Sequence, residues 1–508
     1  MPDNKIFAEH ISKGYNPQGE YIYLGAAMHQ GEVHAEAAVK IPLKTMNRHG
    51  LIAGATGTGK SKTLQILAEN LSEKGVPVLL MDVKGDLSGL AKPSNKEDFI
   101  FERHNKLNFP FEASGSPVEI LSLSKEIGVR LRATVSEFGP VLLARILDLS
   151  PAQSGILSVL FKYCDDQHLP LLDLKDLKKI LQYATEDGKE ELERSYGRIS
   201  AASTGAILRK IVSLEQQGAD LFFGERSFEV EDLVRTNSQG RGYISILRLT
   251  DIQDRPKLFS TFMLSLLAEI YTGFPEQGDS DKPKLVLFID EAHLIFEQAS
   301  SALLDQIESI VKLIRSKGVG IYFVTQNPAD VPADVLGQLG LKVQHALRAF
   351  TARDRKAIKL AAENYPISEF YDTKNVLTTL GIGEALVTAL DEKGRPTPLA
   401  ATMLRAPMSR MDILSLAELQ ELTAASALVQ KYNAEIDRES AYEILNQKID
   451  RADAEKAREK AREERKKLEK ASSGRKRSST GPEKAIVKVL TSATFIRGVM
   501  GVLNKLIR

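Results

Sequence analysis

A glycine-rich stretch near the amino terminus constrains the fold of this chain more than any other feature. Residues 51–63 read LIAGATGTGKSKT, in which a glycine, four residues and Gly-Lys-Ser follow one another. The apolar residues 51–53 indicate the end of a buried strand, and residues 63–70 have helical periodicity. A strand, a glycine-rich turn and a helix in this order form the context in which such a turn binds phosphate groups.

The composition of this turn agrees with phosphate chemistry. Glycines let backbone amides approach a phosphate chain that a Cβ atom would crowd, and the amides that open the helix point at the anion. Lys60 would supply a charge to the terminal phosphates, and the hydroxyl of Ser61 would ligate Mg²⁺. The predicted binding residues are Gly54, Ala55, Thr56, Gly57, Thr58, Gly59, Lys60, Ser61 and Lys62.

Length and composition set broad limits. A chain of 508 residues is long enough for two to four domains, and 43% hydrophobic with 27% charged residues is typical of a soluble globular protein. The net charge of +1 shows no global basic field for nucleic acid, although it does not exclude a local basic patch. Cys164 is the only cysteine, which fits a reducing compartment. With no signal-peptide pattern and no apolar run of membrane-spanning length, we expect a cytoplasmic location and no membrane partner.

Polar side chains follow three apolar runs. Residues 76–81 end at Asp82, residues 284–289 end at Asp290 and Glu291, and residues 320–324 are followed by Thr325 and Gln326. Continuous apolar runs are typical of strands buried on both faces, and open α/β sheets bind ligands at the carboxyl ends of their strands. We therefore expect these side chains to meet the glycine-rich turn at one sheet edge.

Each of these side chains has an expected role. Asp290 would hold Mg²⁺ through water, and Glu291 would polarise the attacking water as a general base. Gln326 would sense the γ-phosphate or orient water. Asp82 would orient water around Mg²⁺, or would only cap a turn. The alternative for the acidic pair is that both carboxylates cap the next helix. ATP is favoured over GTP because no Asn-Lys-x-Asp sequence is found to read guanine.

Several arginines are candidates for contact with phosphate. Arg315, on the helix before the 320–324 strand, would stabilise a transferring phosphoryl group in trans, or would be a surface arginine. Arg48 would lie on the surface, or near the phosphates of its own or a neighbouring subunit. Arg348, Arg353 and Arg355 are alternatives for the same role, or basic contacts to a polymer.

The motifs together resemble a known class. GATGTGKS, LLMDVKGD, LVLFIDEAH, IRSKGVG and YFVTQNP occur in the order of the HerA/FtsK class of P-loop ATPases, and the chain resembles bacterial HerA-like members over roughly residues 21–403. The resemblance implies a RecA-like α/β core, Mg²⁺-dependent ATP hydrolysis and a homo-oligomeric, usually hexameric, ring. By position Arg315 resembles the arginine that reaches the neighbour's ATP, and Arg48 resembles a second one. Asp82, Asp290, Glu291 and Gln326 match as well.

The resemblance leaves the partner open. Family members that act in DNA end resection carry a sizeable amino-terminal β-barrel that docks a nuclease, and the short segment before the turn here argues against a nuclease partner. The chain would be a motor that acts on double-stranded DNA through a ring. The alternative is an ATP-driven switch or scaffold that acts on protein partners without nucleic acid. A metal-dependent hydrolase of another small substrate is a third possibility.

These patterns divide the chain into segments. We predict a small β-element in residues 1–45, a RecA-like ATPase core in 46–90 and 239–403, and a helical insertion in 91–238. A helical arm would follow in 404–470, then a linker in 471–482 and an amphipathic helix in 483–508. That last helix would pack on the ring, form an oligomer contact or lie on a membrane surface.

Overall fold

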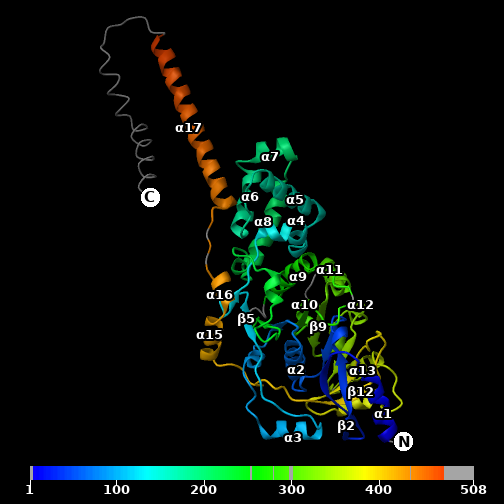
Figure 1. Cartoon of the computed structure of the whole chain (residues 1–508). Helices are drawn as coiled ribbons and strands as arrows, with labels where there is room; N and C mark the ends of the chain where they lie inside the picture. Colours follow the sequence, from blue (N-terminus) through cyan, green and yellow to red (C-terminus); the bar gives the residue numbers. More distant parts are fainter. Residues whose placement is uncertain are drawn as a thin grey trace. The chain divides into compact units, whose positions relative to one another are not determined.

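The computed structural model describes residues 4–251, 255–278, 280–296, 301–349, 351–434, 436 and 438–473. The chain forms two units, Met1–Leu445 and a second one that begins at Asn446. Figure 1 shows the first unit as a large body of strands and helices. Everything that bears on the predicted site lies in this first unit.

One sheet of twelve strands runs through the first unit, in the order β2-β1-β12-β11-β10-β3-β9-β8-β4-β7-β5-β6. The strands are β1 (Tyr21–His29), β2 (Glu32–Pro42), β3 (Gly50–Ala53), β4 (Val78–Asp82), β5 (Val118–Ser122), β6 (Val129–Arg130), β7 (Ile244–Arg248), β8 (Leu285–Ile289), β9 (Val319–Thr325), β10 (Leu341–Gln344), β11 (Glu384–Thr388) and β12 (Ala400–Leu404). The strands from β10 to β6 pair in parallel, whereas those from β2 to β10 pair antiparallel.

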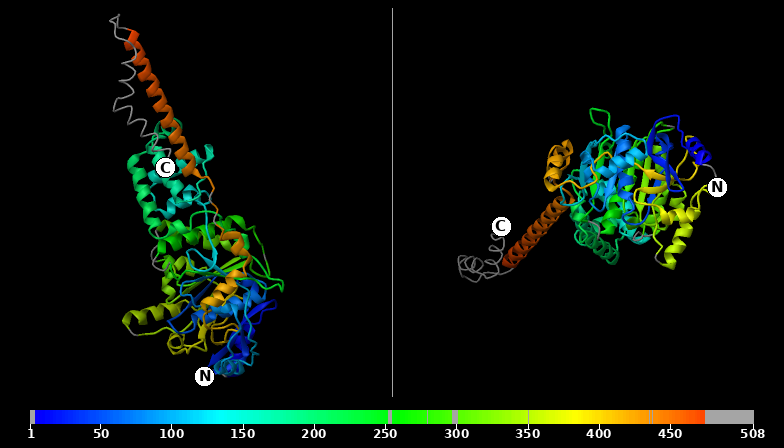
Figure 2. Two further views of the ribbon diagram at one scale, coloured as in Figure 1. Left: turned by 90° about the vertical axis from the view of Figure 1, so that its left-hand side faces the viewer. Right: turned by 90° about the horizontal axis from the view of Figure 1, so that it is seen from below.

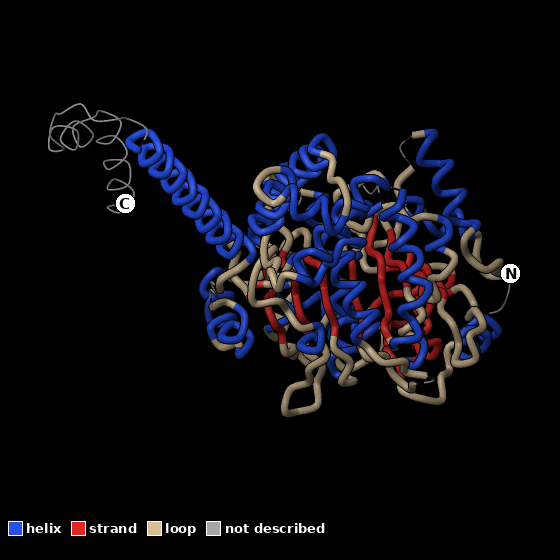
Figure 3. The backbone as a smooth tube through the Cα atoms, turned by 90° about the horizontal axis from the view of Figure 1, so that it is seen from above, coloured by secondary structure: helices blue, strands red, loops and turns tan. Residues whose placement is uncertain are grey.

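The central parallel strands are buried along their whole length. Every residue of β4, β8 and β9 is buried, as expected for strands that have helices on both faces. Figure 3 shows the strands side by side with helices packed in front of them. The main core includes Leu64 and Leu67 of the first crossover helix together with Ile52, Val286 and Val324 of the sheet. The predicted α/β class and RecA-like order of strand, turn and helix are therefore confirmed.

The helices follow the predicted segments closely. They are α1 (Asn4–Gly14), α2 (Lys60–Glu73), α3 (Asp98–Lys106), α4 (Val135–Ile146), α5 (Pro151–Asp166), α6 (Leu174–Thr185), α7 (Lys189–Tyr196), α8 (Ala201–Glu215), α9 (Pro256–Gly273), α10 (His293–Phe296), α11 (Ser301–Ile314), α12 (Ala333–Leu336), α13 (Ala352–Glu363), α14 (Thr373–Thr379), α15 (Leu416–Ala424), α16 (Ala427–Tyr432) and α17 (Ala441–Ser473). Helices α4 to α8 gather at one end of the first unit (Figure 2). Ser150 caps α5 with Pro151 in its first turn, as the sequence predicts.

Three elements depart most from the predicted segments. Helix α1 precedes the first strand and buries Phe7 and Ile11. Strands β5 and β6 lie within the segment interpreted as a helical insertion, yet they extend the parallel sheet beyond β7. β5 carries Glu119, whose polar character hides the strand in the sequence, and Arg235 neutralises that carboxylate at 2.9 Å. The domain boundaries drawn from the sequence stay predictions.

The chain after β12 returns to the core. Residues 405–414, called the 405–414 segment below, run along α2, and α15 and α16 then contact β5 and β6. In the second unit, residues 451–470 of α17 are exposed, as the alternating charges predict. Most of the predicted linker and the whole predicted helix 483–508 lie outside the described residues. In the described part of the chain, no helix is both long and apolar enough to cross a membrane.

Candidate active site

The carboxyl ends of four neighbouring strands bring the predicted side chains to one sheet edge. β3, β9, β8 and β4 are adjacent and parallel, with Ala53 opposite Thr325 and Met81 opposite Ile289. The residues that follow these strands, or end them, are Gly54, Gln326, Asp290 and Asp82. The structure therefore places the glycine-rich turn and the polar strand ends along one line, which we call the carboxyl edge.

The glycine-rich turn is anchored between the two strands that flank β3. The amide of Gly54 donates to the carbonyl of Thr325 at 3.3 Å, and the amide of Ala55 donates to the carbonyl of Ala346 at 2.9 Å. Gly54 has a φ of 154°, and a Cβ atom there would lie 2.5 Å from the Cβ of His345. Thr56 and Gly57 are exposed at the tip of the turn. Only glycine fits position 54, and the tip stays open to a ligand.

Lys60 is the first residue of α2 and is 7% exposed. Its ammonium donates to the carbonyl oxygens of Gly54 at 2.8 Å and Ala55 at 3.2 Å, which holds it over the turn. Burial and the charge of Lys84 lower the pKa of Lys60, while Glu291 and Asp290 oppose that shift. The lysine and the acidic pair therefore act on each other electrostatically, as a shared site requires.

The acidic pair is buried where β8 ends. Asp290 is 5% exposed, and burial raises its pKa to about 6, with Lys84 opposing and Glu291 adding to the increase. The Lys84 ammonium is in direct contact with Glu291 Oε1. The second oxygen, Oε2, lies 3.3 Å from His293 Nδ1, which is within ion-pair distance. The two atoms lack the geometry of a hydrogen bond, so Oε2 has no hydrogen-bond partner among the described residues.

Asp82 makes the contacts of a turn aspartate. Its carboxylate accepts hydrogen bonds from the backbone amides of Gly85 at 2.7 Å, Asp86 at 3.2 Å and Leu87 at 3.2 Å. Burial raises the pKa of Asp82 to about 7, and the nearby charge of Asp86 adds to the increase. These bonds shape the turn that follows β4. The water-orienting role stays a prediction.

The remaining predicted residues of the site differ in what their side chains contact and in how far they are exposed. The Thr58 hydroxyl donates to the carbonyl of Ala55 at 2.7 Å and so stabilises the turn itself. Ser61 is half-buried in the first turn of α2, and Gln326 is exposed after β9. The Lys62 ammonium donates to the carbonyl of Met411 in the 405–414 segment, so this side chain faces the segment rather than the turn.

Arg48 and Arg315 lie at the opposite edge of the sheet. Arg48 precedes β3, and Arg315 opens the short 3₁₀ helix Arg315–Lys317 before β9. Both line a cavity of about 480 Å³. β3 has four residues, which span roughly 13 Å at about 3.3 Å per residue. The strand therefore separates the backbone of Arg48 from the glycine-rich turn, and contact of Arg48 with the phosphates of its own or a neighbouring subunit stays a prediction.

A buried histidine fixes the arginine end of α11. His49 Nε2 donates to the carbonyl of Val311 at 2.8 Å, and His49 Nδ1 accepts from the amide of Ile321 at 2.9 Å. Burial lowers the pKa of His49 to about 4, and the charge of Arg315 lowers it further, while the bond to Val311 opposes the shift. A neutral His49 therefore ties α11 to β9 beside Arg315.

The other candidate arginines are spread more widely. Arg348 is exposed after β10, on the carboxyl side of that strand, and Arg355 is exposed on α13. The side chain of Arg353 lies outside the described residues. Among the described residues, no hydrogen bond or ion pair connects Arg348 or Arg355 to Lys60, and the roles of these arginines stay predictions.

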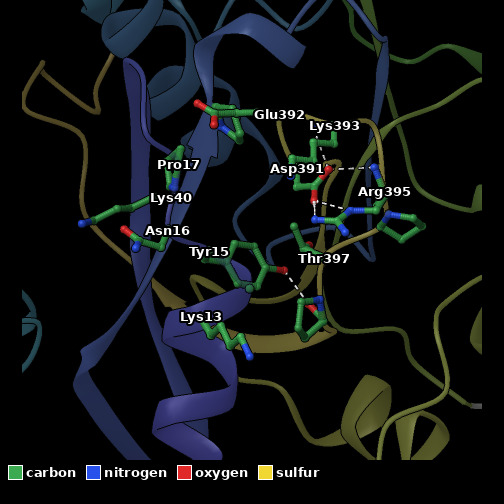
Figure 4. A pocket seen from close by; sticks show the side chains of 14 residues that line it. Lys13, Tyr15, Asn16, Pro17, Lys40, Asp391, Glu392, Lys393, Arg395 and Thr397 are labelled. Carbon is green, nitrogen blue, oxygen red and sulfur yellow. Dashed lines mark hydrogen bonds and ion pairs between the residues drawn. The ribbon is translucent and has the colours of Figure 1, made fainter.

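A second cavity, of about 510 Å³, lies near the same end as Arg48 and is drawn in Figure 4. Asp391 pairs with Arg395 at 2.7 Å, and the Tyr15 hydroxyl donates to the carbonyl of Pro398 at 2.7 Å. Glu392 accepts from the amide of Gly19 at 2.8 Å. These contacts join the segment after α1 to the chain between β11 and β12. The contacts of Tyr15 and Glu392 thus connect these two segments at the cavity.

Sequence analysis missed two side chains of the carboxyl edge. Lys84 lies two residues after Asp82. Its position just after a buried strand is a local signal that could have predicted a charged group at the carboxyl edge. His345 follows β10, is fully buried and shares a 2.8 Å hydrogen bond with the Thr63 hydroxyl of α2. Burial lowers the pKa of His345 to about 4. Its place next to the turn depends on the order of the strands, which the sequence does not show.

Comparisons with known proteins agree with this geometry. The family model described as "Helicase HerA-like C-terminal" matches residues 27–507. The DNA double-strand break repair helicase HerA of Sulfolobus acidocaldarius is 22% identical over 70% of this chain and 65% of its own length. The helicase of the same name from Saccharolobus solfataricus is 21% identical over 76% of this chain and 71% of its own length. The chain thus spans about two thirds of the relatives that it matches.

A solved structure shares the fold. The bacterial conjugative coupling protein TrwBdeltaN70, in a trigonal form in complex with sulphate, superposes with a TM-score of 0.52 at 15% identity. The match covers 80% of this chain and 94% of that one. At this identity the likeness shows the fold alone, and it supports the strand order on which the carboxyl edge rests.

Proposed function

Because the chain belongs to the helicase HerA-like C-terminal family, we propose that it is a Mg²⁺-dependent ATPase whose reaction takes place at the carboxyl edge. The observation that carries the proposal is the meeting of the Lys60 ammonium, over the glycine-rich turn, with the buried carboxylates of Asp290 and Glu291. Burial lowers the pKa of Lys60 and raises the pKa of Asp290, and perturbed pKa values that cluster in one place favour a functional site.

The side chains at this edge suit Mg²⁺. Mg²⁺ prefers oxygen ligands and is bound through one or two protein groups together with substrate phosphates and water. The Ser61 hydroxyl and the Asp290 carboxylate supply such oxygens. Among the described residues no three His, Cys, Asp or Glu side chains form a metal site of their own, which suits an ion held partly by substrate. When bound, Mg²⁺ neutralises charge on the β- and γ-phosphates.

The residues of the edge divide the chemistry among them. The amides of the glycine-rich turn and the Lys60 ammonium would bind the phosphates. A water oxygen would form a bond to the γ-phosphorus as the bond to the β–γ bridging oxygen breaks, and ADP would leave with that electron pair. The Glu291 carboxylate would take the proton of the attacking water. Gln326, exposed beside the pair, would orient that water or contact the γ-phosphate.

The first test replaces the proposed base. Glu291→Gln keeps the size of the side chain but cannot take a proton, so we expect phosphate release to fall by about 10²–10⁴-fold. Binding of a fluorescent ATP analogue should persist, because the phosphate contacts are unchanged. Lys106→Met, on the exposed end of α3, serves as a control that should match the wild type. Hydrolysis near the wild-type rate in Glu291→Gln would remove Glu291 from this role.

The arginines at the opposite edge support a ring. Arg315 and Arg48 face away from the phosphates of their own chain, so contact with ATP requires a second copy. Head-to-tail contacts of this kind close into rings when the rotation allows. We propose a homo-oligomeric, hexameric ring in which Arg315 of one subunit stabilises the phosphoryl group held by the next.

The relatives favour DNA as the substrate of the motor. Two of them are named DNA double-strand break repair helicases, and we propose that this chain acts on double-stranded DNA. Duplex DNA should then raise the rate of phosphate release, and the stimulation should fall as salt rises, because phosphate contacts release counterions. A rate that DNA does not change at low salt would favour the alternative, a switch or scaffold that acts on protein partners.

A further inference from the structure

Lys84 is a charged group of the carboxyl edge that the proposed reaction does not use. It lies in the turn after β4, and β4 is the direct neighbour of β8 in the sheet. Its ammonium contacts Glu291 Oε1, and its side chain is 40% exposed whereas that of Glu291 is 8% exposed. A half-exposed lysine thus reaches inward to a buried carboxylate.

The carboxylate that Lys84 meets is poorly held by anything else. Glu291 Oε2 lacks a hydrogen bond, and besides Lys84 the described residue within ion-pair distance of this carboxylate is His293. The backbone of Glu291 has a φ of 47°, in the left-handed region that is unfavourable for a residue with a Cβ atom. Strained backbone of this kind is retained where it orients a functional side chain.

Lys84 itself is held by the turn that carries it. Asp82 accepts hydrogen bonds from the amides of Gly85, Asp86 and Leu87, so the residues on both sides of Lys84 are tied to the end of β4. The contacts therefore run from Asp82 through the turn to Lys84, and from Lys84 to Glu291. Asp82 thus shapes the turn that carries Lys84, which is the structural alternative that the sequence offered for this residue.

We propose that Lys84 is a positioning residue that fixes the Glu291 carboxylate in the orientation needed to receive a proton from water. The proposal rests on the proposed ATPase function and deepens it. The geometry points to this role because Lys84 contacts the base directly. In a second interpretation, Lys84 binds the γ-phosphate as Lys60 does. Loss of Lys84 would then weaken ATP binding, whereas loss of a positioning residue would lower kcat.

The experiment uses Lys84→Met, Lys84→Arg and the control Lys106→Met in the full chain. Phosphate release gives kcat and KM for ATP, and a fluorescent ATP analogue gives the dissociation constant. We expect Lys84→Met to lower kcat by about 10–100-fold, the usual cost of removing a group that orients another. KM and the dissociation constant should stay near those of the wild type, and Lys84→Arg should keep more of kcat than Lys84→Met.

The double variant separates positioning from a general structural effect. If Lys84 acts only through Glu291, then Lys84→Met should cause no further loss of rate in the Glu291→Gln protein. A melting temperature equal to that of Lys106→Met would show that Lys84→Met is folded. If the melting temperature of Lys84→Met is lower, the same comparison is made with Lys84→Arg, alone and combined with Glu291→Gln. This substitution keeps the positive charge but moves the head group.

Three results would overturn the proposal. Weaker binding of the ATP analogue with kcat unchanged would make Lys84 a phosphate ligand instead. An additional loss of rate in the Glu291→Gln background would show that Lys84 acts on something other than Glu291. Wild-type kinetics in Lys84→Met would remove the role altogether. If the wild type itself releases no phosphate, the ATPase proposal fails first and the role of Lys84 falls with it.

Discussion

The charged side chains at the two edges of the central sheet differ in how far they are buried. At the carboxyl edge Asp82, Asp290 and Glu291 are between 1% and 6% exposed, and burial raises the pKa of the two aspartates. At the opposite edge Arg315 is exposed, and Asp391 and Arg395 pair in reach of solvent. Burying a charge is costly unless it is paired or hydrogen-bonded, whereas exposed charge carries no such cost. The difference agrees with our proposal that the reaction takes place at the carboxyl edge and that the opposite edge contacts a neighbouring subunit.

The largest effect that would test this division is expected at Arg315. If this arginine completes the site of a neighbouring subunit, Arg315→Ala should lower phosphate release by about 10³–10⁵-fold while ATP binding is retained. Lys312→Ala, an exposed residue that lines the same cavity, is the matched control. A full rate in Arg315→Ala would break the division, since the opposite edge would then take no part in the reaction.

Mixing two inactive variants sharpens the same point. In a ring that contains both Glu291→Gln and Arg315→Ala subunits, some sites combine an intact Glu291 with an intact Arg315 from the neighbour. Phosphate release should therefore recover when the two proteins are unfolded, mixed and reassembled. If Arg315 served the site of its own chain, the mixture would stay as inactive as its components.

The next largest effect, on stability, is expected where the 405–414 segment packs on α2, the helix that begins at Lys60. Glu69 of α2 pairs with Arg405 at 2.7 Å, with side chains 7% and 4% exposed, and also accepts hydrogen bonds from Met408 and Ser409. Removing one partner of a buried pair costs about 3–5 kcal/mol. We expect Arg405→Met to lower the free energy of unfolding by this amount, as measured by urea denaturation. An unchanged midpoint would mean that the 405–414 segment does not stabilise α2.

The change in stability with pH that arises from the carboxyl edge should be somewhat smaller than the effect of Arg405→Met. Burial raises the pKa of Asp82 from 3.8 to about 7, so the folded chain binds this proton more tightly than the unfolded chain. The resulting stabilisation is complete below about pH 4 and is lost as the pH rises through about 7, with an upper bound of about 4 kcal/mol at 1.36 kcal/mol per pKa unit.

Asp82→Asn removes this titration. The variant should therefore lose less stability than the wild type between about pH 5 and pH 8, and the difference isolates Asp82 because Asp290 titrates in both proteins. Urea denaturation at several pH values measures it. Parallel pH curves for the two proteins would contradict the raised pKa.

The smallest effect is expected at the opposite edge. Arg395 pairs with Asp391 at 2.7 Å, but its side chain is 69% exposed, and exposed pairs contribute at most about 1 kcal/mol. Arg395→Ala should change the urea midpoint very little and leave the rate of phosphate release unaltered. A loss as large as that of Arg405→Met would erase the contrast between the two edges.

The sequence predicted the elements whose signals are local. The spacing of Gly54, Gly59 and Lys60 depends on residues close in the chain, and β3, the turn and α2 lie where that spacing placed them. The cap at Ser150 is likewise a local hydrogen bond. Strand β5 was missed because pairing with β7, rather than its own residues, makes it a strand.

By itself the sequence determined that a glycine-rich turn between a strand and a helix, and three buried strands with polar ends, exist, because glycine spacing and apolar runs are properties of neighbouring residues. The tertiary structure alone decided that β3, β9, β8 and β4 are adjacent, that Lys84 meets Glu291, and that Arg48 and Arg315 face the other way. The physical reason is that packing between distant segments sets the order of the strands and the side of the sheet on which each strand ends. No local sequence pattern contains this information.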